Sequence, residues 1–331
     1  MEMKLYIVKQ KINKIMTVQE LKSTIRLCVE SDGNINVEIF VLLKNQEIKK
    51  ANFLQVLQPE VVTMFTNVIT NQLLEADYMV LNASSADERK DVVYYYDLAP
   101  TERLDVFQQV QNGENVFPYF SFANDGVNNI DAFLFVLGSA AQQIVLYKRL
   151  ASVNVYQKRA GLFVREEDNQ FTKLDSDVIK IIPQIDAFMI NGEIYFMNLS
   201  LLENAFRIHD VLRESARQQI ALLQEFGLVE NIDALEIELE NVSFARKFSK
   251  LVFNSPVLGK VSNQAIIDFT NAHPALQSKF RYSADGSKLQ LVTKLSKKLF
   301  IKLLNDDYLT SNLTNQYYDS IAKDKVSVEL E

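Results

Sequence analysis

The chain has 331 residues, 48% of them hydrophobic, with 35 basic and 42 acidic side chains and a formal net charge of −7. This length and apolar content can fill one large core or two moderate ones, and the acidic balance argues against nucleic-acid binding by the chain as a whole. The single cysteine, Cys28, cannot form an internal disulfide, and with only His209 and His273 beside it a zinc site has too few ligands.

The N-terminal residues MEMKLYIVKQ interleave acids and bases without an apolar stretch, so we expect no secretory leader and a cytoplasmic chain. The longest uncharged run, 132–147, is interrupted by GSAAQQ and falls short of the ~20 apolar residues that a membrane-spanning helix needs. Its two apolar parts, FLFVL and QIVLYKR, instead predict a hairpin with its turn at Gly138 and Ser139.

Mixed elements are expected before this hairpin. Branched and aromatic residues favour a strand at 36–43, and Pro59 suits the first turn of an amphipathic helix. The segments DYMVL and VVYYYDL then predict two strands, and Thr101 is a candidate N-cap for a helix that ends near Val110.

After the hairpin the chain is first rich in strands and then helical. Asn191-Gly192 predicts a second hairpin, and Asp285-Gly286 predicts another near the C-terminus. Between them, apolar spacing predicts one long helix over 201–226 that Gly227 stops. We therefore expect an α+β protein with a mixed N-terminal domain (1–125) and a strand-rich, then helical C-terminal domain (126–331).

Motifs for nucleotide-binding loops or hydrolytic catalysis are absent from the sequence. The nine glycines never form GxGxxG or GxxxxGK[ST], and neither HExxH nor GxSxG occurs. His209 and His273 lack a partner that the sequence can recommend, so we interpret both as structural. No catalytic residue, cofactor or metal ligand is predicted on this basis.

A metal-dependent nuclease remains as an alternative. Such enzymes use an aspartate and a Glu-x-Lys pair on neighbouring strands, and Asp32, Glu47 and Lys49 have that order. The signal is weak, because Glu20-Leu21-Lys22 shows how readily the spacing arises. An Asp175-Ser176-Asp177 triplet could also hold a metal, although an exposed loop between strands is the better explanation.

Charge is distributed unevenly along the chain. Between residues 244 and 302 there are eleven basic and two acidic residues, a net +9 that leaves −16 for the remainder. Phosphate binding depends on such local clusters rather than on net charge. The sequence predicts a DNA-binding surface made of Arg246, Lys247, Lys250, Lys294, Lys297, Lys298 and Lys302.

Three of these lysines, Lys294, Lys298 and Lys302, recur every four residues, so a helix would place them on one face, opposite Leu295 and its apolar neighbours. A solvated helix face is the simpler interpretation of such a stripe. The acidic stretch 225–240 could also neutralise part of the basic segment. Six acids there do not cancel eleven bases, so we expect a residual positive surface.

Three stretches together resemble the KwaB family, the B subunit of the Kiwa antiphage system. They are the hairpin FLFVLGSAAQQIVLYKR with the following QKRAGLFV, then IDAFMINGEIYFMNLSLLENAF, then LNDDYLTSNLTNQYYDSIAKDKV. The resemblance covers much of 130–331. It implies a cytoplasmic homodimer or higher homo-oligomer that binds DNA, acts with a membrane-embedded KwaA-like subunit and is recruited by it to the inner face of the membrane. It implies no established catalytic triad.

The combined interpretation favours a DNA-binding antiphage effector over an enzyme. The nuclease remains open as one alternative. The other is a non-enzymatic interaction module whose basic face binds an acidic protein or anionic lipid.

Overall fold

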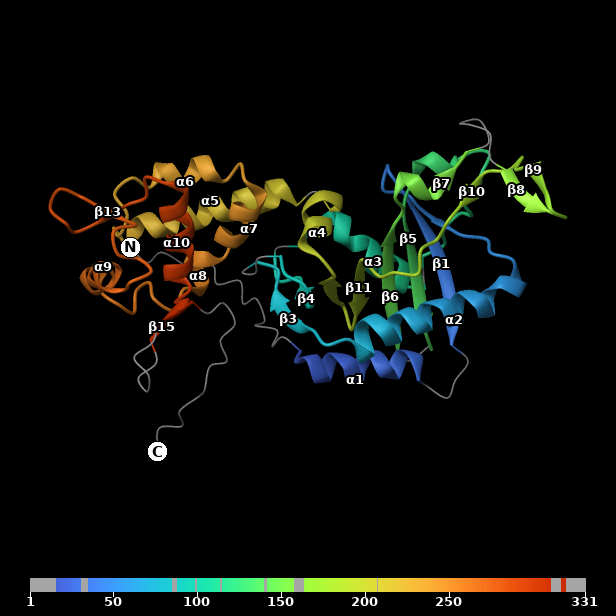
Figure 1. The fold of residues 1–331 in the computed structure, drawn as a ribbon, viewed down its shortest axis with the longest axis horizontal. Helices are drawn as coiled ribbons and strands as arrows, with labels where there is room; N and C mark the ends of the chain where they lie inside the picture. Colours follow the sequence, from blue (N-terminus) through green and yellow to red (C-terminus); the bar gives the residue numbers. More distant parts are fainter. Residues whose placement is uncertain are drawn as a thin grey trace. The chain divides into compact units, whose positions relative to one another are not determined.

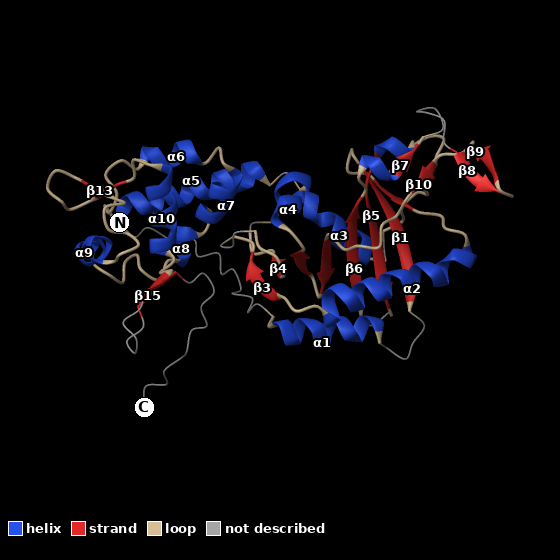
Figure 2. Cartoon of the chain, in the orientation of Figure 1, coloured by secondary structure: helices blue, strands red, loops and turns tan. Residues whose placement is uncertain are grey.

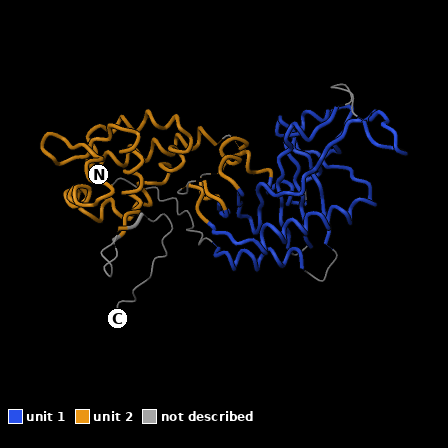
Figure 3. Tube along the Cα trace, in the orientation of Figure 1, with its two compact units in different colours: residues 1–80, 91–95, 107–197 blue, residues 81–90, 96–106, 198–331 orange. Residues whose placement is uncertain are grey.

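The computed structural model describes residues 16–30, 35–84, 88–98, 100–113, 115–139, 142–157, 164–206, 208–310 and 317–319. The chain divides into two compact units, shown in different colours in Figure 3. Unit 1 comprises 1–80, 91–95 and 107–197, and unit 2 comprises 81–90, 96–106 and 198–331.

A large sheet forms the centre of unit 1, and eight of the described strands belong to it. In spatial order they are β2 (Ile48–Lys50), β1 (Asn36–Leu43), β5 (Ile130–Gly138), β6 (Gln143–Arg149), β11 (Ala187–Ile190), β12 (Glu193–Phe196), β4 (Val92–Tyr95) and β3 (Met79–Asn82). The pair β1 and β5 is antiparallel, with Ile39 opposite Phe135. The expected domain boundary at residue 125 therefore falls inside unit 1, because these strands from either side of it share one sheet.

Both predicted hairpins of this sheet are confirmed. β5 pairs with β6 in antiparallel register, and Gly138 at the turn has φ +137°, a backbone region that side chains rarely adopt. β11 pairs with β12 across Asn191 and Gly192, both at positive φ as a type I′ turn requires. Short-range turn chemistry thus determined these pairings.

Helices cover both faces of the sheet, which explains why its central strands are apolar at nearly every position. On one face, α1 (Val18–Val29) and α2 (Gln58–Ile69) pack through Ile25 and Phe65 onto β1 and β5 (Figure 1). On the other, α3 (Asp105–Gln111) places Phe107 with its ring centroid 6.0 Å from that of Tyr147. Cys28 is fully buried in α1, as expected of a core thiol.

Two small two-stranded sheets complete unit 1, and the second of them is a hairpin. β7 (Val155–Tyr156) pairs with β10 (Val178–Ile179), and β8 (Val164–Glu167) pairs with β9 (Gln170–Lys173). The combination of helices and strands, with strands first and helices later, confirms the α+β class (Figure 2). None of the helices in the described ranges is long and apolar enough to cross a membrane.

Unit 2 is mainly helical. Its helices are α4 (Leu199–Ala205), α5 (His209–Glu225), α6 (Asp233–Glu238), α7 (Val242–Phe248), α8 (Leu251–Asn254), α9 (Asn263–Ala272) and α10 (Lys294–Leu304). Two hairpins accompany them: β13 (Arg281–Tyr282) with β14 (Leu289–Gln290), and β15 (Tyr308–Thr310) with β16 (Tyr317–Asp319). The hairpin at Asp285-Gly286 is thereby confirmed.

The prediction of one helix over 201–226 is wrong, because the chain forms α4 and α5 with a break between them. Phe206 and Ile208, which lie within the break, are both buried. Residues two apart on a continuous helix point roughly 200° apart, since each residue turns the helix by about 100°. The break allows both side chains to enter the core. Gly227 does end α5 at φ +62°, as predicted.

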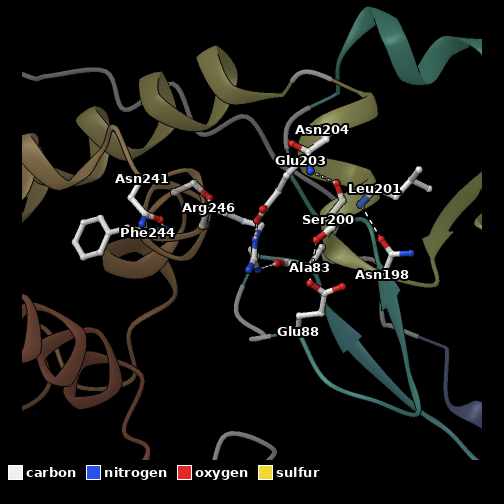
Figure 4. Close-up of polar contacts among 12 residues, drawn as sticks. Ala83, Glu88, Asn198, Ser200, Leu201, Glu203, Asn204, Asn241, Phe244 and Arg246 are labelled. Carbon is white, nitrogen blue, oxygen red and sulfur yellow. Dashed lines mark hydrogen bonds and ion pairs between the residues drawn. The ribbon is translucent and has the colours of Figure 1, made fainter. Parts of the chain in front are cut away.

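Arg246, predicted to contact DNA, is buried inside unit 2 with 1% of its surface exposed. Its Nε lies 3.0 Å from Oε1 of Glu203 in α4, and its Nη1 donates to the carbonyl oxygen of Ala83 (Figure 4). Ala83 belongs to the segment 81–90, which reaches unit 2 from the N-terminal half of the chain. Arg246 therefore joins α7, α4 and this segment, and its role in the fold is internal.

Replacement of Arg246 by alanine should destabilise the protein strongly. The change leaves Glu203 without its cation and Ala83 without a donor, and breaking a buried ion pair costs about 3 to 5 kcal/mol. Urea denaturation followed by helical circular dichroism measures the loss. Lys260→Ala, at an exposed position of the same unit, is the matched control and should change stability by less than ~0.5 kcal/mol. Equal stability of the two variants would contradict a structural role for the Arg246 pair.

Candidate nucleic-acid interface

The structure separates the seven residues predicted to bind DNA into two groups. Arg246, Lys250 and Lys297 form ion pairs within unit 2. Lys297 is 7% exposed, and its Nζ lies 2.9 Å from Oε1 of Glu238. Lys250 is partly exposed, and its Nζ lies 3.5 Å from Oδ2 of Asp97. The expectation that the acidic stretch 225–240 supplies an internal partner is confirmed for Lys297.

The other four residues line one hollow. Lys247 from α7 and Lys294, Lys298 and Lys302 from α10 surround a cavity of about 360 Å³, which we call the lysine pocket. Its lining comes entirely from unit 2. The structure thus brings Lys247 together with three lysines from a distant part of the sequence, all of which belong to the predicted seven-residue surface.

The geometry of α10 explains why its three lysines reach the pocket. Thr293 caps the helix by accepting from the backbone N–H of Ser296, so the helix begins at Lys294. A rise of about 1.5 Å per residue spreads the three lysines, four residues apart, over roughly 12 Å of one face. The opposite face buries Phe300 and Leu304 in the core.

The apolar face of α10 differs from the expected one. Leu295 is 52% exposed and Lys297 is buried, although the spacing had placed leucines inside and lysines outside. Lys297 is tolerated in the interior because Glu238 neutralises it. The buried face is therefore shifted around the helix toward Lys297 and Ile301.

Electrostatically, the lysine pocket favours anions. Its carboxylates are Glu238, which bonds to Lys297, and Asp307, which is buried. Among the described residues, Lys294 and Lys298 have no ion-pair partner. Both are exposed, so their ammonium groups are available to a bound anion.

Uncharged side chains complete the lining. Phe244 and Ile301 are buried apolar residues, and Asn241, Ser243 and Asn305 contribute polar groups. Oδ1 of Asn241 accepts from the backbone N–H of Phe244 at 3.1 Å and so caps α7 (Figure 4). The sequence pattern did not indicate these three polar residues. Only Asn241 carries a local signal, an N-cap residue before an apolar helix.

The candidate nuclease residues are partly brought together in unit 1. Nζ of Lys49 lies 2.7 Å from Oε1 of Glu47 and 3.8 Å from Oδ1 of Asp125. The hydrogen bond from Lys49 lowers the pKa of Glu47, and the same bond raises the pKa of Lys49. Asp32, the third candidate, lies outside the described residues. The Lys49 ammonium therefore pairs with the carboxylates that a nuclease would use to bind a metal ion.

The remaining metal and catalytic candidates stay separate. Asp175 and Asp177 are exposed, and Asp175 pairs with Lys173 at 2.9 Å. His273 is buried, its Nδ1 accepts from the N–H of Ala275 at 3.2 Å, and burial lowers its pKa. Across the described ranges, no group of three or more His, Cys, Asp or Glu side chains could hold a metal ion.

Comparison with known proteins places this architecture in a family. The family described as Kiwa protein KwaB-like matches residues 127–314. The chain is 28% identical over 319 residues to the Kiwa protein KwaB of Escherichia coli O55:H7 (strain RM12579 / EPEC), with 94% of this chain and 99% of that protein covered. No solved structure matches significantly. The family match covers more than half of the chain and includes α7, α10 and the lysine pocket, so the chain belongs to the KwaB-like family of Kiwa proteins.

Proposed function

We propose that this Kiwa antiphage defence component acts by binding DNA through the lysine pocket. The observation that carries the proposal is the convergence of Lys247, Lys294, Lys298 and Lys302 on one hollow, with two of the lysines free of ion pairs among the described residues. Lysines bind phosphates as point charges and read little base sequence, so binding should be tolerant of sequence.

The negative net charge of the chain does not oppose this function. Counterion release depends on the phosphates that a local cluster neutralises, and the basic segment carries a net +9 within a chain of −7. Arg246 and Lys297 are left out of the proposed contact surface, because both are buried in ion pairs. Lys250 pairs with Asp97 and is a secondary candidate.

Replacing Lys294, Lys298 and Lys302 together by glutamine should weaken DNA binding and flatten its salt dependence. Up to three phosphate contacts are lost, so the slope of log affinity against log salt should decrease in magnitude by about 2 to 3. Fluorescence anisotropy with a labelled duplex over a salt series measures the slope. Protection from phage should be lost in parallel, while circular dichroism stays near wild type.

A triple variant at Lys260, Lys279 and Lys288 is the matched control. These exposed lysines lie in the same unit outside the pocket, so their replacement by glutamine changes the net charge equally. An unchanged slope in the pocket variant, or an equal change in both variants, would argue against the lysine pocket as the DNA site.

Competition between duplex DNA and anionic vesicles separates DNA binding from binding to lipid, and an acidic protein as a third competitor tests the remaining alternative.

We further propose that the protein works as a homo-oligomer together with a membrane-embedded KwaA-like subunit, which recruits it from the cytoplasm to the inner face of the membrane. This part of the proposal rests on membership of the Kiwa family. Closed symmetric assembly is the usual form of soluble oligomers.

The purified chain should therefore show a mass above that of its 37.9 kDa monomer in light scattering at micromolar concentration. It should stay in the supernatant of vesicle sedimentation unless the partner subunit is present. A monomer mass would refute the oligomer, and sedimentation with vesicles in the absence of a partner would refute recruitment.

A metal-dependent nuclease is the second candidate, because Glu47 and Lys49 of the Glu-x-Lys pair lie beside a further carboxylate, that of Asp125. We expect duplex and single-stranded DNA to stay intact with the protein and magnesium or manganese, because the ion pairs occupy these carboxylates. Gel analysis after prolonged incubation is the measurement. The matched control is Lys44→Ala, at an exposed lysine that lines a hollow with Glu47 and Asp125. Cleavage that Glu47→Gln or Lys49→Ala abolishes, and that Lys44→Ala leaves unchanged, would establish the nuclease instead.

A further inference from the structure

The shape of the lysine pocket restricts which part of a nucleic acid it can hold. Its volume of about 360 Å³ lies near the lower limit of small-ligand pockets, roughly 300 to 1,000 Å³. A hollow of this size admits a group comparable to one nucleotide. The side of a continuous duplex can contact the edge of the lysine pocket but cannot fill it. The terminal nucleotide of a strand can enter the pocket.

The available charges also favour a strand end. Lys294 and Lys298 stand one helical turn apart, about 6 Å along α10. Neither has an ion-pair partner among the described residues, so both ammonium groups can bind one anion. An internal phosphodiester carries a single negative charge, whereas a phosphate monoester carries about −1.5 to −2 at pH 7. The two positive charges of Lys294 and Lys298 therefore match the charge of a phosphate monoester better than that of a phosphodiester.

The surroundings strengthen this match. Glu238 would repel an anion, but its bond to the buried Lys297 neutralises it. Phe244 and Ile301 provide an apolar wall, and charges interact more strongly beside such a wall than in open water. The carbonyl oxygen of the Asn241 amide is engaged in the cap of α7, so the amide offers its N–H donors to a phosphate oxygen.

We infer that the lysine pocket binds a terminal phosphate monoester in preference to an internal phosphodiester, so that the protein recognises phosphorylated DNA ends. The inference rests on the proposed DNA-binding function and adds the part of the DNA that is held. Lys294 and Lys298 bind the phosphate, and Lys297 is a positioning residue that acts through Glu238. The same chemistry could be supplied by a free nucleotide, which the experiment distinguishes.

Binding is measured by anisotropy and competition with one duplex sequence in three forms: with 5′-phosphates, with 5′-hydroxyls, and as a covalently closed circle. The phosphorylated duplex should bind about tenfold more tightly than the hydroxyl form, since one more charge-assisted hydrogen bond contributes roughly that factor. The closed circle should bind no better than the hydroxyl form. A free deoxynucleoside monophosphate and inorganic phosphate serve as competitors and as ligands in thermal-shift assays.

The double variant Lys294→Gln/Lys298→Gln should bind the phosphorylated and hydroxyl duplexes equally. The matched control, Lys260→Gln/Lys288→Gln, should keep the wild-type preference, because both residues are exposed in the same unit and do not line the pocket. Lys297→Met should reduce the preference by leaving Glu238 uncompensated, and Lys297→Met/Glu238→Gln should restore it. This rescue separates a positioning role from a loss of folding.

The outcomes distinguish the inference from the function on which it rests. If all three DNA forms bind equally to the wild type, or if the double variant weakens all forms by the same factor, end recognition is wrong and DNA binding stands. If no form binds but the monophosphate stabilises the wild type and not the double variant, the pocket takes free nucleotides and the DNA-binding proposal fails. If neither DNA nor phosphate binds, both proposals fail.

Discussion

A buried guanidinium must have a carboxylate beside it, and this requirement organises the helical unit. Arg246 meets it by bonding to Glu203 and to the carbonyl oxygen of Ala83. The three groups come from α7, α4 and a segment of the N-terminal half of the chain, so the pair fixes α7 within unit 2. Lys247 is the next residue of α7. Its place at the lysine pocket therefore depends on an ion pair inside the fold.

The same principle acts at α10. Lys297 is drawn into the interior by Glu238, and this rotates the helix so that Leu295 is exposed while Lys294 and Lys298 face solvent. One buried lysine thus orients two exposed ones. The pair also removes the repulsion that Glu238 would exert on an anion in the pocket. The basic segment has two functions as a result, because some of its cations hold the fold together and the others remain available for binding.

In unit 1, both the apolar strands of the sheet and the charged residues near Lys49 have structural roles. β5 and β11 are buried along nearly their whole length, so their apolar residues have a structural explanation. At the sheet edge, Lys49 bonds to Glu47 and approaches Asp125. A cation already occupies the position at which a divalent metal would bring the carboxylates together. At the lysine pocket, by contrast, Lys294 and Lys298 have no ion-pair partner among the residues that the structure describes.

The sequence by itself determined the features that depend on neighbours along the chain. It predicted β1, the hairpins at Gly138, at Asn191-Gly192 and at Asp285-Gly286, and the end of α5 at Gly227, because turn geometry and strand periodicity are set within a few residues. It also placed Lys294, Lys298 and Lys302 on one helix face. The family resemblance was available from the same short apolar stretches, and the family match confirmed it.

Only the tertiary structure decided which basic residues are available at the surface. Arg246 and Glu203 are 43 residues apart, and Lys297 and Glu238 are 59 residues apart, so no local pattern could reveal that these cations are neutralised inside the protein. The break between α4 and α5 likewise arises because Phe206 and Ile208 must both enter one core. Periodicity describes the faces of an isolated helix, whereas burial and pairing depend on the elements that pack against it. For this reason only the folded structure shows that the lysines of α10 and Lys247 of α7 line one pocket.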